Sequence, residues 1–130
     1  MKEYSIDYFS NSKWVFVLIK DGEIVYCSKD RGLKPLIFCL RNYKAQMQGA
    51  VVFDKIVGRA AALFLICGKV KKIFSLTISQ GALNVLKENG VGMEYKKKVE
   101  NILNKNSSDV CLMEKLSQGK TADEFCKEFI

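Results

Sequence analysis

One stretch in the middle of the chain constrains its fold more than any other. Ala50–Phe53 is an apolar run too short for a helix and typical of a buried strand. Ile56–Cys67 then has the composition of a helix that is apolar almost all round, interrupted only by Gly58 and Arg59, and Gly68 ends it. At about twelve residues this helix is too short to span a membrane. The stretch predicts a buried strand that leads into a buried helix.

Asp54 and Lys55 occupy the junction between this strand and this helix. A carboxylate at that point is typical of a helix N-cap, which is one interpretation of Asp54. In open α/β sheets, ligands also bind at the carboxyl ends of strands, which is the other. A lysine at a helix N-terminus is unfavourable by roughly 0.3–1 kcal/mol, so Lys55 could serve to meet a phosphate or to pair with Glu114.

The rest of the chain alternates between strand and helix patterns. Two strands, 14–20 and 23–28, flank Asp21-Gly22, which is a strong hairpin signal. Further elements are predicted over 33–43 (helix), 70–78 (strand), 80–89 (helix capped by Ser79), 91–97 (edge strand) and 121–129 (helix opened by a capping box). Because one strand, a helix and the next strand follow with short joints, the strands ending at Phe53 and Ile78 are expected to be parallel.

Taken together, the elements predict an α/β fold: one domain over residues 1–130, a three-layer α/β/α sandwich on a five-stranded mixed sheet. The parallel strands would place two helix N-termini side by side, with Asp54 and Ser79 as neighbours. Free backbone amides at such ends attract anions, although Asp54 would compete for them.

Composition excludes several classes of chemistry. The chain has no histidine, so catalysis by Ser-His-Asp or Cys-His is excluded. The net charge is +7, but the lysine clusters are short and carry no interleaved aromatics, so we interpret them as a solvated surface rather than a nucleic-acid site. No signal or lipidation motif is recognised, and we expect a cytoplasmic protein without a membrane partner.

The five cysteines show no C-x-x-C spacing, which argues against a disulfide framework or a structural zinc cluster. Cys39 and Cys67 lie in apolar runs and are predicted to be buried, unreactive core residues. Cys111 lies near Glu114 and could be a reactive thiol beside an acid. Without a histidine to activate it, an inert, half-buried cysteine is the favoured interpretation, and Cys111 would be the first to react with a thiol reagent.

The order of elements resembles the core of the cytidine deaminase fold, and the local sequence resembles a small prokaryotic family of unknown function that has this fold. The matching segments are Lys20–Val25, Gly32–Leu36, Asp54–Ala62, Ile78-Ser79 and Cys111–Lys115. The segment from Asp54 is the most specific. The chain departs from the family at Leu112, where proline is usual, so the shape of that loop is expected to differ.

The resemblance implies the fold but not deaminase chemistry. Zinc deaminases need three nitrogen or sulfur ligands and a glutamate, in His-x-Glu or Cys-x-Glu and Pro-Cys-x-x-Cys motifs. The corresponding positions here are Asp54-Lys55-Ile56 and the segment from Ser79, and neither contains histidine or cysteine. We therefore expect no metal, no cofactor and no deamination of cytidine or adenosine.

Our leading hypothesis is a protein that binds a nucleotide-like or nucleoside-like small molecule in the pocket that corresponds to the active site of the deaminases. The candidate ligand-binding residues are Asp54, Lys55, Gly58, Arg59, Ser79, Cys111 and Glu114. The alternatives are an enzyme without zinc, with Asp54 or Glu114 as base and Lys55 or Arg59 as electrostatic stabiliser, and a non-catalytic interaction module. A homo-oligomer is compatible with each of them.

Overall fold

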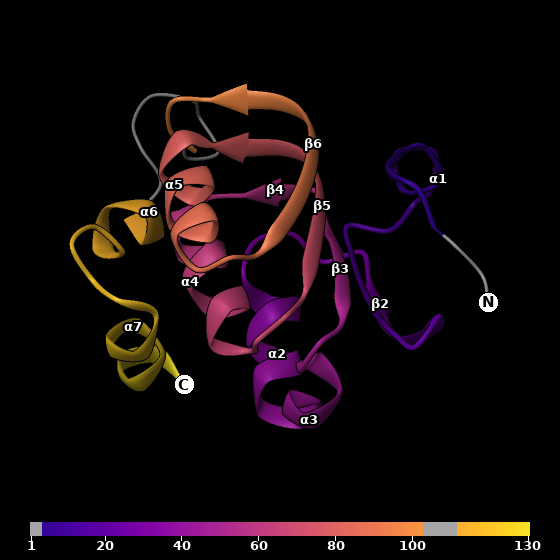
Figure 1. The fold of residues 1–130 in the computed structure, drawn as a ribbon, viewed down its shortest axis with the longest axis horizontal. Coiled ribbons are helices and arrows are strands. Elements are labelled where there is room, and N and C mark those ends of the chain that lie inside the picture. The colour runs from indigo at the N-terminus through magenta and orange to yellow at the C-terminus, as the bar shows by residue number, and fades with distance from the viewer. Residues whose placement is uncertain (1–3, 103–111) are drawn as a thin grey trace.

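A computed structural model describes residues 4–102 and 112–130 (Figure 1). The helices are α1 (Ile6–Ser10), α2 (Lys34–Asn42), α3 (Lys44–Met47), α4 (Arg59–Cys67), α5 (Gln80–Glu88), α6 (Leu112–Leu116) and α7 (Ala122–Phe129). The strands are β1 (Phe16–Lys20), β2 (Glu23–Ser28), β3 (Val51–Asp54), β4 (Ile56–Val57), β5 (Lys72–Ser79) and β6 (Gly92–Val99). In the described part of the chain, no helix combines the length and the apolar character needed to cross a membrane.

The strands form one mixed sheet. β1 pairs antiparallel with β2 and with β3, whereas β3, β4 and β6 all run parallel to β5. β4 continues the line of β3 in unchanged register, because Phe53 pairs with Phe74 and Ile56 pairs with Thr77. The sheet therefore has five lines of strands, as predicted, and the central line is interrupted only at Lys55.

The alternation of side chains along the strands assigns them to two apolar clusters. Phe16 and Leu18 of β1 belong to the large core that contains the buried residues of α2, α4, α5 and α7. Val17 and Ile19 of the same strand join a smaller cluster with Phe9 of α1. The sheet thus lies between α1 on one side and the main helices on the other (Figure 1), which confirms the three-layer α/β/α prediction.

The hairpin signal between β1 and β2 is confirmed. Asp21 has a φ of 51° and Gly22 a φ of 81°, so both turn residues are left-handed. This is the signature of a type I′ turn, whose twist matches that of the two flanking strands. The hairpin places the amino end of β1 and the carboxyl end of β2 at the same edge of the sheet.

The predicted start of the central helix is wrong. Ile56 and Val57 pair with Thr77 and Ile78 as strand β4, and α4 begins only at Arg59. Strand pairing with β5 satisfies backbone groups that a longer helix would otherwise have used. Asp54 is therefore the last residue of β3, inside the central line of strands, and it is not a helix cap.

The C-terminal helix α7 confirms its capping box. Thr121 accepts a hydrogen bond from the Glu124 amide, and the Glu124 side chain accepts one from the Thr121 amide. α7 packs against α4, with the rings of Phe64 and Phe125 centred 4.9 Å apart. This contact buries Phe125 completely and places α7 outside α4, away from the sheet.

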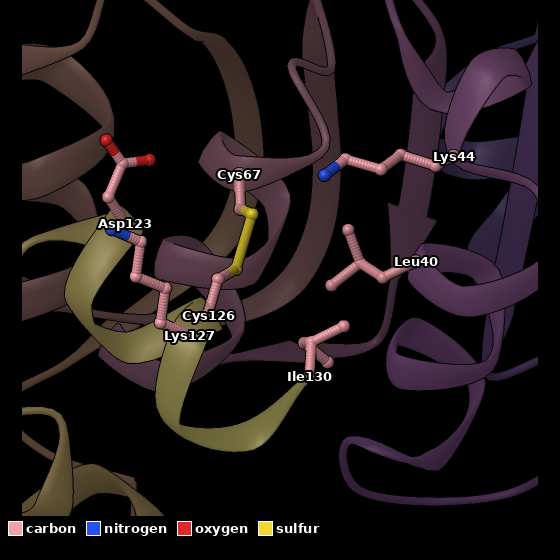
Figure 2. Close-up of a pocket in the computed structure, with 7 residues that line it drawn as sticks. All are labelled: Leu40, Lys44, Cys67, Asp123, Cys126, Lys127 and Ile130. Carbon is pink, nitrogen blue, oxygen red and sulfur yellow. A yellow bond between two sulfur atoms is a disulfide. The ribbon is translucent and has the colours of Figure 1, made fainter.

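The cysteines are only partly as predicted. Cys39 is fully buried, and burial raises the pKa of its thiol to about 12. Cys67, expected as a free core residue, is instead joined to Cys126 by a disulfide between the end of α4 and α7 (Figure 2). The sequence separation of 59 residues gives no local signal for this pair, which explains why spacing arguments missed it.

We expect reduction of the disulfide to lower the free energy of unfolding. Closing a loop between residues 59 apart restricts the unfolded chain, and the loop-entropy relation gives roughly 4 kcal/mol for this length. Denaturant titrations of oxidised and reduced protein measure the difference. Cys126→Ser lacks the bond under both conditions and should match the reduced protein. Equal free energies for the oxidised protein and this variant would contradict the expectation.

Candidate functional site

A cavity of about 840 Å³ opens at the carboxyl ends of the central strands. Its walls come from the start of β1, the segment before α2, the end of β3 with β4, the start of α4, and α6. The lining residues are Val15, Arg31, Gly32, Leu33, Asp54, Lys55, Ile56, Gly58, Ala60, Ala61, Ile102, Met113 and Glu114. The volume lies within the roughly 300–1,000 Å³ typical of small-molecule sites.

Asp54 supplies a buried carboxyl group to this cavity. Only 4% of the residue is exposed to solvent, and burial raises its pKa to about 8, although a hydrogen bond with the Ile56 backbone acts in the opposite direction. The group is therefore predominantly protonated at neutral pH. A neutral carboxyl offers one O–H donor together with acceptor oxygen, whereas a carboxylate only accepts.

Glu114, from α6, caps the amino terminus of α4. Its Oε1 accepts a hydrogen bond from the Arg59 amide, and its Oε2 accepts one from the Ile102 amide at 3.3 Å. A carboxylate in this place is favourable because the N-terminal amides of a helix carry partial positive charge. Only 3% of Glu114 is exposed, so these hydrogen bonds are made away from bulk water.

Position 58 requires glycine because the Glu114 carboxylate occupies the space that a side chain would need. A Cβ atom on Gly58 would lie 2.9 Å from Oε2 of Glu114 and 2.9 Å from Cγ1 of Ile102. The backbone is not the reason for glycine, since its φ of −95° is accessible to any residue. Gly58 is therefore the N-cap residue of α4, and the cap itself comes from another helix.

Arg59 does not line the cavity. Its Nε donates to the Ser117 carbonyl at 3.0 Å, and its Nη2 donates to the Lys120 carbonyl at 2.8 Å. These carbonyls belong to the segment that joins α6 to α7. Arg59 thus ties α4 to the C-terminal segment, and its side chain is committed to that contact, not to a ligand.

Two cations stand at the mouth of the cavity. Lys55 and Arg31 both line it and both are exposed. Within residues 4–102 and 112–130, neither side chain forms a hydrogen bond or an ion pair. The arrangement therefore combines a neutral acid inside with positive charge at the rim.

Ser79 lies outside the cavity, and the expected neighbourhood of Asp54 and Ser79 is wrong. Ser79 caps α5 by accepting a hydrogen bond from the Ala82 amide at 3.1 Å. Val57 pairs with Ile78, so Ser79 lies beside Gly58. Gly58 is four residues after Asp54, and four residues of strand span about 13 Å. The two helix N-termini are neighbours, but the residues at their ends are Gly58 and Ser79.

Four of the seven candidate residues thus share the cavity: Asp54, Lys55, Gly58 and Glu114. Arg59 and Ser79 have other contacts, and Cys111 lies outside the described residues. Arg31 also lines the cavity and was not among the residues predicted from the sequence. A signal for it was present, because β2 runs in the same direction as β3, so the segment after β2 had to emerge at the same edge as Asp54.

The described residues contain no group of three or more Asp, Glu, Cys and His side chains that could hold a metal ion. The two buried carboxyl groups of the cavity are also poorly suited to bind a metal ion. Glu114 accepts hydrogen bonds from backbone amides, and Asp54 carries a proton at neutral pH. The donor set is suited to hydrogen bonding with a ligand.

Comparison with known proteins gives a consistent family and fold. The family described as "Domain of unknown function (DUF1893)" matches residues 6–130. The crystal structure of a DUF1893 family protein (TM1506) from Thermotoga maritima is 30% identical, with a TM-score of 0.85, over 95% of this chain and 83% of that one. A search of curated proteins gives no match.

The fold is also similar to part of a larger protein. RibD from Acinetobacter baumannii, in its form 1, matches with a TM-score of 0.51 and 20% identity. The match covers 62% of this chain and 27% of RibD, so it concerns the fold alone. The predicted cytidine deaminase-like fold and the predicted resemblance to a family of unknown function are both confirmed.

We expect Gly58→Ala to destabilise the protein by roughly 1–3 kcal/mol, because the new methyl group would displace the Glu114 carboxylate from the α4 amide. Gly81→Ala is the matched control. Its Cβ would meet Arg59 at an ordinary 3.6 Å inside α5, where alanine favours a helix by about 1 kcal/mol. Denaturant titration measures both variants, and a Gly58→Ala protein as stable as wild type would exclude the proposed cap.

We expect the stability of the protein to fall between pH 4 and pH 8 through Asp54. The unfolded chain releases this proton near the ordinary pKa of 3.8, whereas the folded chain holds it until about 8. Between these values unfolding releases a proton, so raising the pH favours the unfolded state. The measurement is the free energy of unfolding as a function of pH. Subtracting the same curve for Asp54→Asn, which lacks the titrating group, isolates the contribution of Asp54. A difference profile that is flat, or that rises with pH, would show that Asp54 is charged in the folded protein.

Proposed function

This chain belongs to the family described as "Domain of unknown function (DUF1893)", and we propose that it binds a nucleotide-like small molecule in the cavity beside Asp54. The observation that carries the proposal is the combination, in one cavity, of a buried carboxyl group, whose pKa is raised by burial, with two exposed cations at the mouth. Such a site suits a ligand with a polar ring at one end and an anionic group at the other.

Asp54 would recognise the ring of the ligand. A protonated carboxyl presents a donor and an acceptor side by side, which matches the edge of a heteroaromatic ring that offers an acceptor nitrogen next to an amino group. Because Asp54 is 4% exposed, water competes weakly for this pairing. The apolar walls formed by Leu33, Ile56 and Met113 would contact the faces of the ring.

Lys55 and Arg31 would hold the anionic group. Both are exposed at the mouth, and a guanidinium can bind two phosphate oxygens at once. The helix terminus of α4 is a poor alternative, because Glu114 already occupies its amide and would repel a phosphate. We therefore propose that a phosphate binds at the rim of the cavity and not at the N-terminus of α4.

We further propose that small molecules, rather than nucleic acid, are the partners, and that the protein acts in the cytoplasm. Lys96, Lys97 and Lys98 lie on β6, which pairs only with β5 among the described strands and forms an edge of the sheet. Charged side chains are common on such edges, where they prevent association with other strands. This supports interpreting them as a solvated surface.

Proton transfer by Asp54 is a second candidate function. An acid with a pKa of about 8 in a cavity is poised to exchange a proton near neutral pH, as general acids and bases must. The earlier alternative also assigned a role to Arg59, but its hydrogen bonds to the Ser117 and Lys120 carbonyls remove it. Loss of turnover in Asp54→Asn with retained binding would favour this candidate.

Calorimetric titration with nucleoside monophosphates and the matching nucleosides tests the proposal. Lys55→Ala and Arg31→Ala should weaken monophosphate binding by roughly threefold to tenfold each and leave nucleoside binding unchanged, since each removes one rim charge. Asp54→Ala should weaken both classes. Lys87→Ala, on the exposed side of α5, is the charge-matched control and should alter neither. Equal affinities in wild type and all three cavity variants would exclude this site.

A further inference from the structure

A second, smaller cavity of about 280 Å³ lies beside the disulfide, where the end of α4 and α7 face α2 and α3 (Figure 2). Its lining residues are Leu40, Lys44, Cys67, Asp123, Cys126, Lys127 and Ile130. Lys44, Asp123, Lys127 and Ile130 are exposed, so the cavity opens to solvent. The disulfide therefore forms part of the wall of an accessible cavity and is not enclosed in the core.

The two cysteine residues differ in exposure. Cys126 is 7% exposed, within α7, whereas Cys67 is partly exposed at the last position of α4. Cys67 is therefore the residue of the pair at which we expect a nucleophile to attack. Thiol–disulfide exchange requires this kind of access, because the attacking thiolate must approach one sulfur directly.

The charged side chain that approaches the disulfide is a cation, which favours an anionic reagent. Lys44 extends from α3 toward the disulfide, whereas the side chains of Asp123 and Lys127 lie on the opposite side of it (Figure 2). Nearby cations stabilise thiolates, both the attacking one and the one that leaves.

We propose that Cys67–Cys126 is an exchange site for anionic low-molecular-weight thiols. The thiolate of the reagent attacks Sγ of Cys67, the S–S bond breaks, and Cys126 leaves as a thiolate with the electron pair. A second reagent thiolate attacks the reagent sulfur of the mixed disulfide and releases Cys67 as a thiolate. The two cysteine thiolates take protons from solvent, so two reagent thiols are oxidised to one disulfide while the protein disulfide is reduced to two thiols.

Opening the bond would loosen the C-terminal segment. That segment is attached to both ends of α4: Glu114 and the Ser117 and Lys120 carbonyls hold the end at Arg59, and the disulfide holds the end at Cys67. Without the bond, α7 is held by packing of Phe125 and by a hydrogen bond that Arg41 of α2 donates to the Phe129 carbonyl. The site therefore couples the redox state to the order of α7, and this inference does not depend on the proposed ligand.

The test is exchange of the folded, full-length protein with glutathione, which is anionic, and with cysteamine, which is cationic. Peptide mapping by mass spectrometry without denaturant locates the mixed disulfide. We expect it on Cys67, with glutathione reacting faster than cysteamine after correction for the thiolate fraction of each. Lys44→Ala should reduce that preference by roughly threefold, and Lys87→Ala should not change it.

Several outcomes would overturn the proposal. The Cys67–Cys126 link could persist in glutathione until denaturant is added, or the adduct could form on Cys126 alone. The protein could also be isolated with the thiols of Cys67 and Cys126 both free. If oxidised glutathione then fails to form the disulfide between them, the proposal is overturned as well. Hydrogen exchange gives a readout independent of labelling: amides of α7 should exchange faster in reduced protein and in Cys126→Ser, and unchanged rates would remove the coupling.

Discussion

The rest of the structure depends on the carboxylate of Glu114 at the amino terminus of α4. α4 is the buried centre of the molecule, and a helix of this kind needs partners for its first amides. No side chain of its own N-terminal segment provides one, because Gly58 is the N-cap residue. Glu114 supplies the cap from α6, and the absence of a Cβ on Gly58 lets the carboxylate approach. This contact thus caps the start of α4 and attaches α6 to it.

This cap also determines the chemistry available to the cavity. Two carboxyl groups line it, and their surroundings differ. Glu114 accepts hydrogen bonds from two backbone amides, whereas Asp54 is desolvated, and this burial raises its pKa to about 8. The Glu114 side chain thus occupies the place at the N-terminus of α4 where an anionic ligand could otherwise bind. The positively charged side chains of the cavity are those of Lys55 and Arg31.

Local patterns were sufficient to predict most of the fold, but not the start of α4. Asp21-Gly22 and the Thr121 capping box are signals within a few residues, and both gave the correct element. Residues 51–57 form one line of strand that is interrupted only at Lys55. Because Asp54 and Lys55 are a polar pair inside a buried strand, they resembled the end of that strand. Pairing with β5, a non-local interaction, determines that Ile56 and Val57 are extended.

The candidate site shows the same division between local and non-local information. The sequence identified the junction at Asp54 and Lys55, and the cavity is there. The contacts of Arg59 were not predictable, because its partners, the carbonyls of Ser117 and Lys120, are backbone groups that no residue type reveals.

The disulfide likewise joins distant residues, one at the end of α4 and one in α7. All these long-range contacts connect α4 with the segment after residue 112, and Met113 and Glu114 of that segment form part of the cavity wall. The shape of the cavity therefore depends on how the C-terminal segment is attached, and not on the strand–helix junction alone.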